Sequence, residues 1–203
     1  MDKIILIGNG GHAKACAEII EAENKFKIEG VIANREDWSS DKKFLDYSII
    51  GEDKELEKFK DVQFALIGIG QIKSPRVRIK LFKRLIRLKY ILPIIVSPTS
   101  ILSKRIYIGK GTIIMHHVIV NANSEIGENC IINNKALIEH DAIIGDNCHI
   151  STGVIVNGSV EIGNNCFVGS NATIMQGVKI GNECTISAGT FVNKNLEDNT
   201  KIK

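Results

Sequence analysis

Several features that define large classes of protein are missing from this chain. No apolar run approaches the roughly 18 residues that a membrane-spanning helix needs. The first residues, MDKIILIGNGG, have no cationic leader before their apolar stretch and do not predict a signal peptide. A net charge of +3 is too small to indicate a nucleic-acid-binding surface. We expect a globular cytoplasmic protein with neither a membrane span nor a nucleic-acid partner.

What the C-terminal half does contain is a six-residue repeat. Every sixth position from 108 to 192 is Ile or Val, fifteen in succession without an insertion. The position four residues after each of these is mostly small, and Ile-Gly pairs recur every 18 residues from Ile108-Gly109 to Ile180-Gly181. A period of six is the signature of hexapeptide β-helix repeats. Three hexapeptides then make one triangular coil, and successive coils are expected about 4.8 Å apart.

The five cysteines show no paired spacing such as CxxC, which a zinc or redox site would need. Cys130, Cys148, Cys166 and Cys184 are 18 residues apart and fall in the small column of the repeat. Free cysteine fills small buried positions well. We predict a stack of reduced core thiols, with no disulfide framework and no metal.

The N-terminal half follows a different pattern. Residues 4–7 form a short apolar strand, followed by GNGGHAK (8–14) and a helical pattern through about Glu23. The glycine turn has GxGxxA spacing at Gly8, Gly10 and Ala13. Backbone N–H groups at such a turn, together with a helix N-terminus, suit a phosphate or pyrophosphate.

A second glycine turn, Gly68-Ile69-Gly70, follows a predicted strand over 64–67. Both turns end parallel strands and are expected to face one crevice. An NAD site needs an acidic residue after the second strand, but the strand over 27–32 runs into Ala33-Asn34-Arg35. A nucleotide-linked ligand held through its phosphates fits better.

Residues 75–89, PRVRIKLFKRLIRLK, hold seven basic residues and no acid. Val77, Leu81, Leu85 and Leu88 give the segment an apolar stripe at helical spacing, widened by Phe82 and Ile86. We expect an amphipathic helix docked on the sheet with its cationic face in solvent. Contact with phosphate or a membrane surface is the alternative.

The tripeptide Glu139-His140-Asp141 interrupts an aliphatic stretch, ALIEHDAIIG, within the repeat. His140 is two residues past an inward Ile and is expected on the outside of the coil near a corner. A histidine can accept a proton near neutral pH, and a neighbouring carboxylate orients and stabilises the imidazole. From the residues alone, a solvated surface turn and a general base both remain open, and Glu139 is the alternative partner for the ring.

The whole chain resembles the NeuD/PglD-type hexapeptide-repeat acetyltransferases, which act on sialic acids and nucleotide-linked amino sugars. The resemblance rests on GNGGHAK (8–14), IEHDAIIGDNCHIS (138–151) and NGSVEIGNNCFVGSNATI (157–174). It implies an α/β Rossmann-like sugar-nucleotide-binding domain over 1–90 and a left-handed parallel β-helix acetyltransferase domain over 91–203. It also implies a homotrimer with acetyl-CoA between neighbouring β-helices.

The resemblance also implies roles for particular residues. His140 would be the general base and Asp141 its orienting carboxylate, with direct attack of the acceptor on the thioester. The residues implied at the coenzyme are His149, Gly158, Ser170 and Ala188. Those implied at the sugar nucleotide are Gly10, Gly11, His12 and Gly68.

The sequence therefore predicts N-acetylation of a nucleotide-linked 4-amino-4,6-dideoxy sugar for surface glycan biosynthesis. Sialic acid O-acetylation and a non-catalytic sugar-nucleotide-binding β-helix are the alternatives. A carbonic-anhydrase-like zinc enzyme is a further rival. His116, His117, His140 and His149 do not stack on one edge of an 18-residue coil, which argues against that zinc site.

Overall fold

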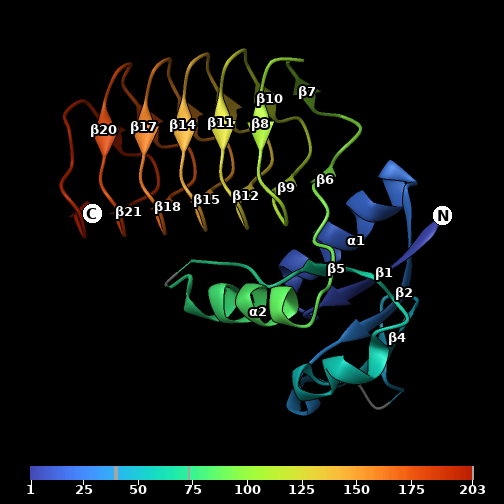
Figure 1. Cartoon of the computed structure of the whole chain (residues 1–203). Coiled ribbons are helices and arrows are strands. Elements are labelled where there is room, and N and C mark those ends of the chain that lie inside the picture. Colours follow the sequence, from blue (N-terminus) through green and yellow to red (C-terminus); the bar gives the residue numbers. More distant parts are fainter. Residues whose placement is uncertain (39–40, 73, 203) are drawn as a thin grey trace.

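The computed structural model describes residues 1–38, 41–72 and 74–202. It consists of an N-terminal α/β part followed by a long stack of triangular coils (Figure 1). The N-terminal sheet has the order β3-β4-β2-β1-β5, with every neighbouring pair parallel except β3 and β4. Its strands are β1 (Asp2–Ile7), β2 (Phe26–Ile32), β3 (Lys43–Phe44), β4 (Tyr47–Gly51) and β5 (Phe64–Ile67). The helices are α1 (Gly11–Glu23), α2 (Arg76–Arg87) and the 3-10 turns η1 (Arg35–Asp37) and η2 (Asp53–Phe59).

The two α-helices cover opposite faces of this sheet. Helix α1 packs with Ile4 and Leu6 in a core that also includes Ile113 and Ile131 of the coils. Helix α2 packs through Leu81 and Leu85 on the other side, against Ile5 and Ile7. Because β1 is buried on both faces, it is a continuous apolar run and not an alternating one.

The coils contain three parallel sheets of two-residue strands. The β9 face consists of β6 (Ile95–Val96), β9 (Ile113–Ile114), β12 (Ile131–Ile132), β15 (His149–Ile150), β18 (Phe167–Val168), β21 (Thr185–Ile186) and β23 (Lys201–Ile202). The β10 face consists of β7 (Ile101–Leu102), β10 (Ile119–Val120), β13 (Leu137–Ile138), β16 (Ile155–Val156), β19 (Thr173–Ile174) and β22 (Phe191–Val192). The β11 face consists of β8 (Tyr107–Ile108), β11 (Glu125–Ile126), β14 (Ile143–Ile144), β17 (Glu161–Ile162) and β20 (Lys179–Ile180).

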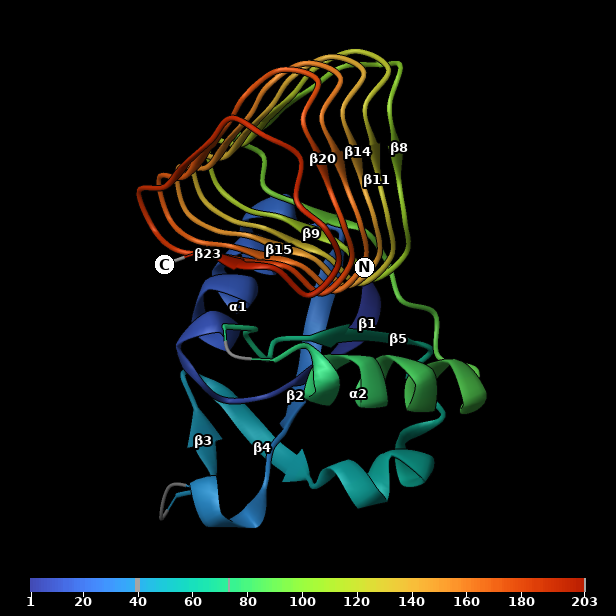
Figure 2. The same ribbon diagram turned by 90° about the vertical axis from the view of Figure 1, so that its left-hand side faces the viewer.

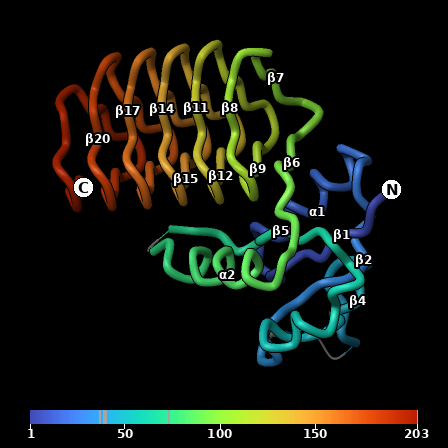
Figure 3. The backbone as a smooth tube through the Cα atoms, viewed as in Figure 1, coloured from blue at the N-terminus to red at the C-terminus, as the bar shows by residue number. Residues whose placement is uncertain are grey.

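From β6 to β22, each strand residue pairs with the one 18 positions further along, as Ile126 with Ile144 and Ile138 with Val156, whereas β21 pairs with β23 at a separation of 16. Seen along the stack, the coils superimpose as a triangle whose β9 face lies against the N-terminal part (Figure 2). The backbone trace shows the same regular rise from β8 to β20 (Figure 3). The predicted fold class, an α/β domain followed by a left-handed parallel β-helix, is confirmed.

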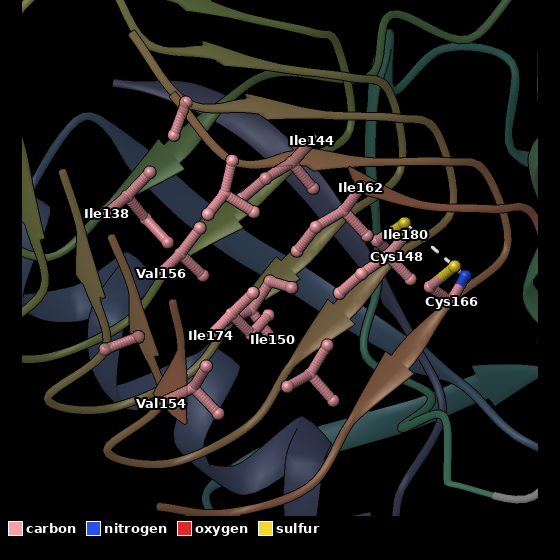
Figure 4. Close-up of a cluster of buried hydrophobic side chains, with 14 of the residues drawn as sticks. Ile138, Ile144, Cys148, Ile150, Val154, Val156, Ile162, Cys166, Ile174 and Ile180 are labelled. Atoms are coloured by element: carbon pink, nitrogen blue, oxygen red, sulfur yellow. Dashed lines mark hydrogen bonds between the residues drawn. The ribbon is translucent and has the colours of Figure 1, made fainter. Parts of the chain in front are cut away.

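The repeat column forms the core of the coils. From Ile114 to Val192 its residues are buried inside the triangle, while Ile108 is partly buried near the first coils (Figure 4). The backbone turns each corner through one residue with positive φ, commonly Asn, and Asp141 occupies one of these positions with φ 59°. The repeat thereby fixes both the inward side chains and the backbone direction at each corner.

Cys130, Cys148, Cys166 and Cys184 are buried in the core of the coils, as predicted, and Cys16 is buried in the N-terminal part. The thiols also act as hydrogen-bonding groups. The Cys148 thiol donates to the Gly163 carbonyl at 3.1 Å and accepts from the Cys166 N–H at 3.4 Å. Thr112 bonds in the same way on an earlier coil, to Gly127 O at 2.8 Å and from Cys130 N–H at 2.9 Å. The cysteine thiol in this column therefore makes the same donor and acceptor hydrogen bonds as the threonine hydroxyl, with a larger and less polar atom.

The prediction for the basic helix was partly wrong. Leu81 and Leu85 are buried as expected, but Val77 and Ile86 are 57% and 39% exposed. Arg78, expected on the solvated face, is 1% exposed. Compared with the prediction, α2 is rotated about its axis so that Arg78 points inward, because its guanidinium donates hydrogen bonds to the backbone carbonyls of Ile67 and Ile69. Across the described ranges, neither α-helix has the length and apolar content of a membrane crossing.

Candidate active site

A cavity of about 710 Å³ lies at the carboxyl ends of the N-terminal strands. Both glycine turns line it. A Cβ built on Gly10 or Gly11 would meet no atom within 4 Å, so these residues leave open space in front of their backbone. Gly8 has a φ of +108°, which favours glycine in the turn between β1 and α1. Parallel α/β sheets bind ligands in this crevice, where the strand order reverses.

Gly68 brings the second turn close to the first. A Cβ at Gly68 would lie 2.9 Å from Leu6 Cδ1 and 3.0 Å from Ala13 Cβ. The last position of the GxGxxA motif and Gly68 are therefore small for the same reason, the close approach of α1 to β5. The structure brings the four predicted sugar-nucleotide residues, Gly10, Gly11, His12 and Gly68, around one cavity.

His12 is held as a neutral imidazole. Burial lowers its pKa to about 3, assisted by the positive charge of Arg78 and by His149. The Cys16 Sγ lies within hydrogen-bonding distance of His12 Nε2, at 3.5 Å. A neutral imidazole carries one ring N–H, and this half-buried ring lines the cavity, where the N–H can donate to a phosphate oxygen.

Asp53 also lines this cavity, beside Ala33 and Asn34. An acidic residue in this crevice was not predicted from the sequence, because the dinucleotide-binding pattern places it at the end of β2, where this chain has Ala33 and Asn34. Asp53 follows β4, the neighbour of β2 in the sheet. Strand β4 was not predicted, so the sequence offered no signal that this carboxylate reaches the crevice.

Arg78 ties the second glycine turn to the coils. Its guanidinium donates to the carbonyls of Ile67 and Ile69 at 2.8 Å each, and to Asn129 Oδ1 at 2.9 Å. Asn129 donates on to Asn147 Oδ1 at 2.8 Å. Buried charges require such hydrogen bonds, so the wall of the crevice is held at a fixed position against the β9 face.

Gln71 makes the second link between the crevice and the coils. The Gln71 side-chain amide donates to the backbone carbonyl of Asn147 at 2.8 Å. The backbone carbonyl of Gln71 accepts a hydrogen bond from His149 Nδ1–H. Burial lowers the pKa of His149, and the positive charge of Arg78 lowers it further. Asn133 Nδ2 lies 3.2 Å from His149 Nε2, the acceptor of this neutral tautomer.

His140 and Asp141 form a pair on the outer corner between the β10 and β11 faces. Nδ1 of His140 lies 2.7 Å from Asp141 Oδ2, so Nδ1–H donates to the carboxylate and Nε2 is left as the proton acceptor. The side chains are 55% and 51% exposed. Hydrogen bonds from His140 and from Asn123 lower the pKa of Asp141 and keep it ionised. This is the geometry of a general base with its orienting group.

Gly158, 18 residues further on, lies directly over the His140 ring. A Cβ on Gly158 would lie 2.7 Å from His140 Cε1 and 2.8 Å from Nε2. The imidazole therefore occupies the space that any side chain at position 158 would take. Position 158 was expected at the coenzyme, and the structure shows that it borders His140.

Glu139 is not the partner of the imidazole. Its Oε2 accepts from Asn121 Nδ2 at 2.8 Å, one coil below. His116 and His117 are likewise engaged locally, with His116 Nδ1 2.7 Å from Ser97 Oγ. Within 1–38, 41–72 and 74–202, no group of three or more His, Cys, Asp or Glu side chains is placed to hold a metal.

The residues expected at the coenzyme lie at separate places on one chain. His149 is 6% exposed on the β9 face beneath Gln71. Ser170 and Ala188 share the corner between the β9 and β10 faces, where the Ser170 hydroxyl is 3.0 Å from that of Ser151. Gly158 lies at the next corner with His140. The β10 face separates these two corners.

Comparisons with known sequences match both parts of the chain. Residues 3–85 match the family described as the PglD N-terminal domain. Residues 105–140 and 123–158 match bacterial transferase hexapeptide repeats, and 159–194 match the hexapeptide repeat of succinyl-transferase. A search of curated proteins returns no match.

Solved structures of similar shape include perosamine N-acetyltransferase from Caulobacter crescentus, crystallised with CoA and GDP-perosamine. It is 26% identical with a TM-score of 0.91, covering 99% of this chain and 93% of that one. The acetyltransferase domain of PglB from Neisseria gonorrhoeae is 25% identical with a TM-score of 0.89, covering 99% and 96%. WeeI from Acinetobacter baumannii, at 18% identity and a TM-score of 0.86 over 99% and 96%, shares the fold.

The fold and the domain matches together identify an acyltransferase with hexapeptide repeats. The chain combines a PglD N-terminal domain with transferase hexapeptide repeats, and its resemblance to the NeuD/PglD-type sugar acetyltransferases is confirmed.

Proposed function

We propose that this protein transfers the acetyl group of acetyl-CoA to the amino group of a nucleotide-linked 4-amino-4,6-dideoxy sugar, for surface glycan biosynthesis. The observation that carries the proposal is the His140–Asp141 pair, 2.7 Å apart, with the ring lying over Gly158. A base with a free Nε2 can take the proton from an attacking amine. The amine attacks the thioester directly, and CoA leaves as the thiol.

The crevice supplies the second half of the proposal. A phosphate cradle built by Gly10, Gly11, His12 and Gly68 would be idle with free sialic acid, which carries no phosphate. The perosamine N-acetyltransferase of similar fold binds a nucleotide-linked amino sugar. Both points favour N-acetylation of a sugar nucleotide over sialic acid O-acetylation. We also propose 1–90 and 91–203 as the sugar-nucleotide and acetyl-transfer domains.

The coenzyme is proposed to lie between copies of the chain. His149, Ser170, Ala188 and Gly158 do not meet on one β-helix, but a neighbouring copy packed near the β10 face would bring different corners together. The proposed assembly is a homotrimer, acting in the cytoplasm, where the five free cysteines fit a reducing compartment.

The β10 face supports this assembly. Its outward positions are apolar on successive coils except at Thr173: Ile101, Ile119, Leu137, Ile155 and Phe191. Ile101 and Phe191 are 66% and 59% exposed in the single chain. The outward positions of the β11 face are mixed, with Tyr107 and Ile143 alternating with the charged residues Glu125, Glu161 and Lys179. An apolar column of this length marks an interface between proteins.

We expect Ile119→Asp combined with Ile155→Asp to convert the trimer into monomers, because each change places a charge in a desolvated contact. Size-exclusion chromatography with light scattering measures the mass. Ile86→Asp on α2 is the control, because Ile86 is 39% exposed and Ile119 is 36%. A double variant that keeps the wild-type mass would contradict an interface on this face.

Acceptor identity is tested by offering acetyl-CoA with UDP-, dTDP- and GDP-linked 4-amino sugars and with free sialic acid, and following release of the CoA thiol. We expect release with a nucleotide-linked amino sugar. Release only with sialic acid would favour O-acetylation. If no acceptor releases CoA and acetyl-CoA does not raise the thermal midpoint, the chain is a non-catalytic binding protein, since a ligand of the folded state must stabilise it.

A further inference from the structure

Asp53 is the acidic residue among those that line the crevice. It lines the cavity together with Ala33 and Asn34 at the end of β2. Among the described residues, its carboxylate makes neither a hydrogen bond nor an ion pair, unlike Glu52 and Glu55 beside it. The start of η2 does not depend on Asp53, because Glu52 and Glu55 already form a reciprocal capping box there.

The sheet order fixes the direction in which a sugar nucleotide lies. Strand β5 is at one edge, and Gln71, just beyond its glycine turn, hydrogen-bonds to the coils through Asn147. The sugar must point to this side, where the crevice meets the coils. Because His140 of the same chain lies on the corner opposite the β9 face, the acetyl-transfer site that the sugar reaches belongs to a neighbouring copy in the proposed trimer. The phosphates lie at the turn after β1, and the nucleoside extends the other way, over β2 and then β4.

The position of Asp53 beyond β4 indicates whether its carboxylate would contact the ribose or the base of a nucleotide. In dinucleotide sites an acid at the end of the second strand binds the ribose hydroxyls. That place is held here by Ala33 and Asn34, and β4 is one strand further out, about 4.8 Å. Past the ribose comes the base. Ile32 and Val77, which is 57% exposed, provide apolar contacts along the same cavity.

A carboxylate is an acceptor only, with two oxygens side by side. Among the common bases, guanine alone offers two adjacent donors on its Watson–Crick edge, N1–H and the 2-amino group. Uracil and thymine place a carbonyl on each side of their single N–H, and adenine and cytosine place an acceptor beside their amino group. A carboxylate at this place accepts two bonds from guanine and repels the lone pairs of the others.

We propose that Asp53 reads the guanine base, so that the nucleotide of the acceptor is GDP. This inference rests on the proposed function and names the nucleotide that its crevice selects. Burial raises the pKa of the Asp53 carboxyl, while Arg84 and Lys80 act in the opposite direction. A group that is partly desolvated and without a partner in the free protein gains most from two ligand donors.

The inference is tested by titrating the full chain with GDP, UDP and IDP, the last of which lacks only the 2-amino group of guanine. We expect the wild type to bind GDP more tightly than IDP or UDP. Asp53→Asn replaces one acceptor by a donor and should weaken GDP binding roughly 10- to 100-fold, the usual discrimination of a bidentate pair. UDP affinity should rise, because the neutral amide no longer repels the uracil carbonyls and its N–H can donate to one of them.

Glu57→Gln, on the exposed side of η2, is the matched control and should keep the GDP preference. Equal affinity of the wild type for GDP, IDP and UDP, which requires no variant to fold, would overturn the role of Asp53. A GDP preference that survives Asp53→Asn would do the same. Acetyl transfer to a UDP-linked sugar without any GDP preference rejects this inference alone, whereas the absence of transfer to any acceptor rejects the proposed function.

Discussion

Replacing His140 by Ala is expected to lower kcat for acetyl transfer by about 10²- to 10⁴-fold, the usual contribution of a positioned base. The fold should survive, because the ring is 55% exposed and its hydrogen bond goes to the neighbouring Asp141. The measurement is CoA release at saturating acetyl-CoA and acceptor, with the thermal midpoint recorded for each variant. Binding of the sugar nucleotide should be retained, since the crevice lies on the other part of the chain.

Glu139→Gln is the matched control for His140→Ala. Glu139 is the other carboxylate beside the ring, but it accepts from Asn121 and does not contact the imidazole. Its activity should remain close to that of the wild type. His140→Ala with activity within a few-fold of wild type would contradict the general-base role, and a large loss in Glu139→Gln would reassign the orienting carboxylate.

Gly158→Ala is expected to cost about 10²-fold in kcat, the effect of a misplacement of roughly 1 Å at a reacting group. The added methyl would stand 2.7 Å from Cε1 and 2.8 Å from Nε2 of His140, closer than real contacts allow. The His140 ring must therefore move away from its present position against Gly158. Gly158 has no left-handed φ, so alanine adds bulk there without backbone strain.

Gln176→Ala provides the control for Gly158→Ala, because position 176 is exposed in the same column one coil further on. The double variant His140→Ala/Gly158→Ala distinguishes an effect of Gly158 through the position of His140 from a separate contribution of Gly158 to the reaction. If Gly158 acts by seating the base, the double variant is no slower than His140→Ala, since residues acting as a unit are not additive. Multiplied losses would instead indicate that Gly158 contributes separately, for example through its N–H at the coenzyme.

The regular part of the fold was predictable from the sequence because each coil repeats the same local constraint. Ile138 and Ile144 had to be buried, and Cys148 and Cys166 had to stack, once the period of six was recognised. A strand of two residues has one inward and one outward side chain, so the column left no freedom. The outward position of His140 followed from the same count.

The irregular parts were not predictable to this degree. Arg78 lies in a stretch whose spacing favours an apolar stripe through Val77, yet the arginine is buried and Val77 is exposed. Two carbonyls at the end of β5 and Asn129, 51 residues away in sequence, satisfy the guanidinium. No local pattern encodes a partner at that separation.

The sequence by itself determined the coil, its core columns, the two glycine turns and the presence of a histidine next to a carboxylate. It did so because periodicity and turn chemistry are local properties of the chain. The tertiary structure decided which groups meet: Asp141 and not Glu139 with His140, Gly158 against the ring, and Asp53 with Ala33 and Asn34 in the lining of the crevice. These contacts depend on which coils and strands lie side by side and on which conformation each side chain adopts. Both are set by packing in three dimensions and not by the local sequence.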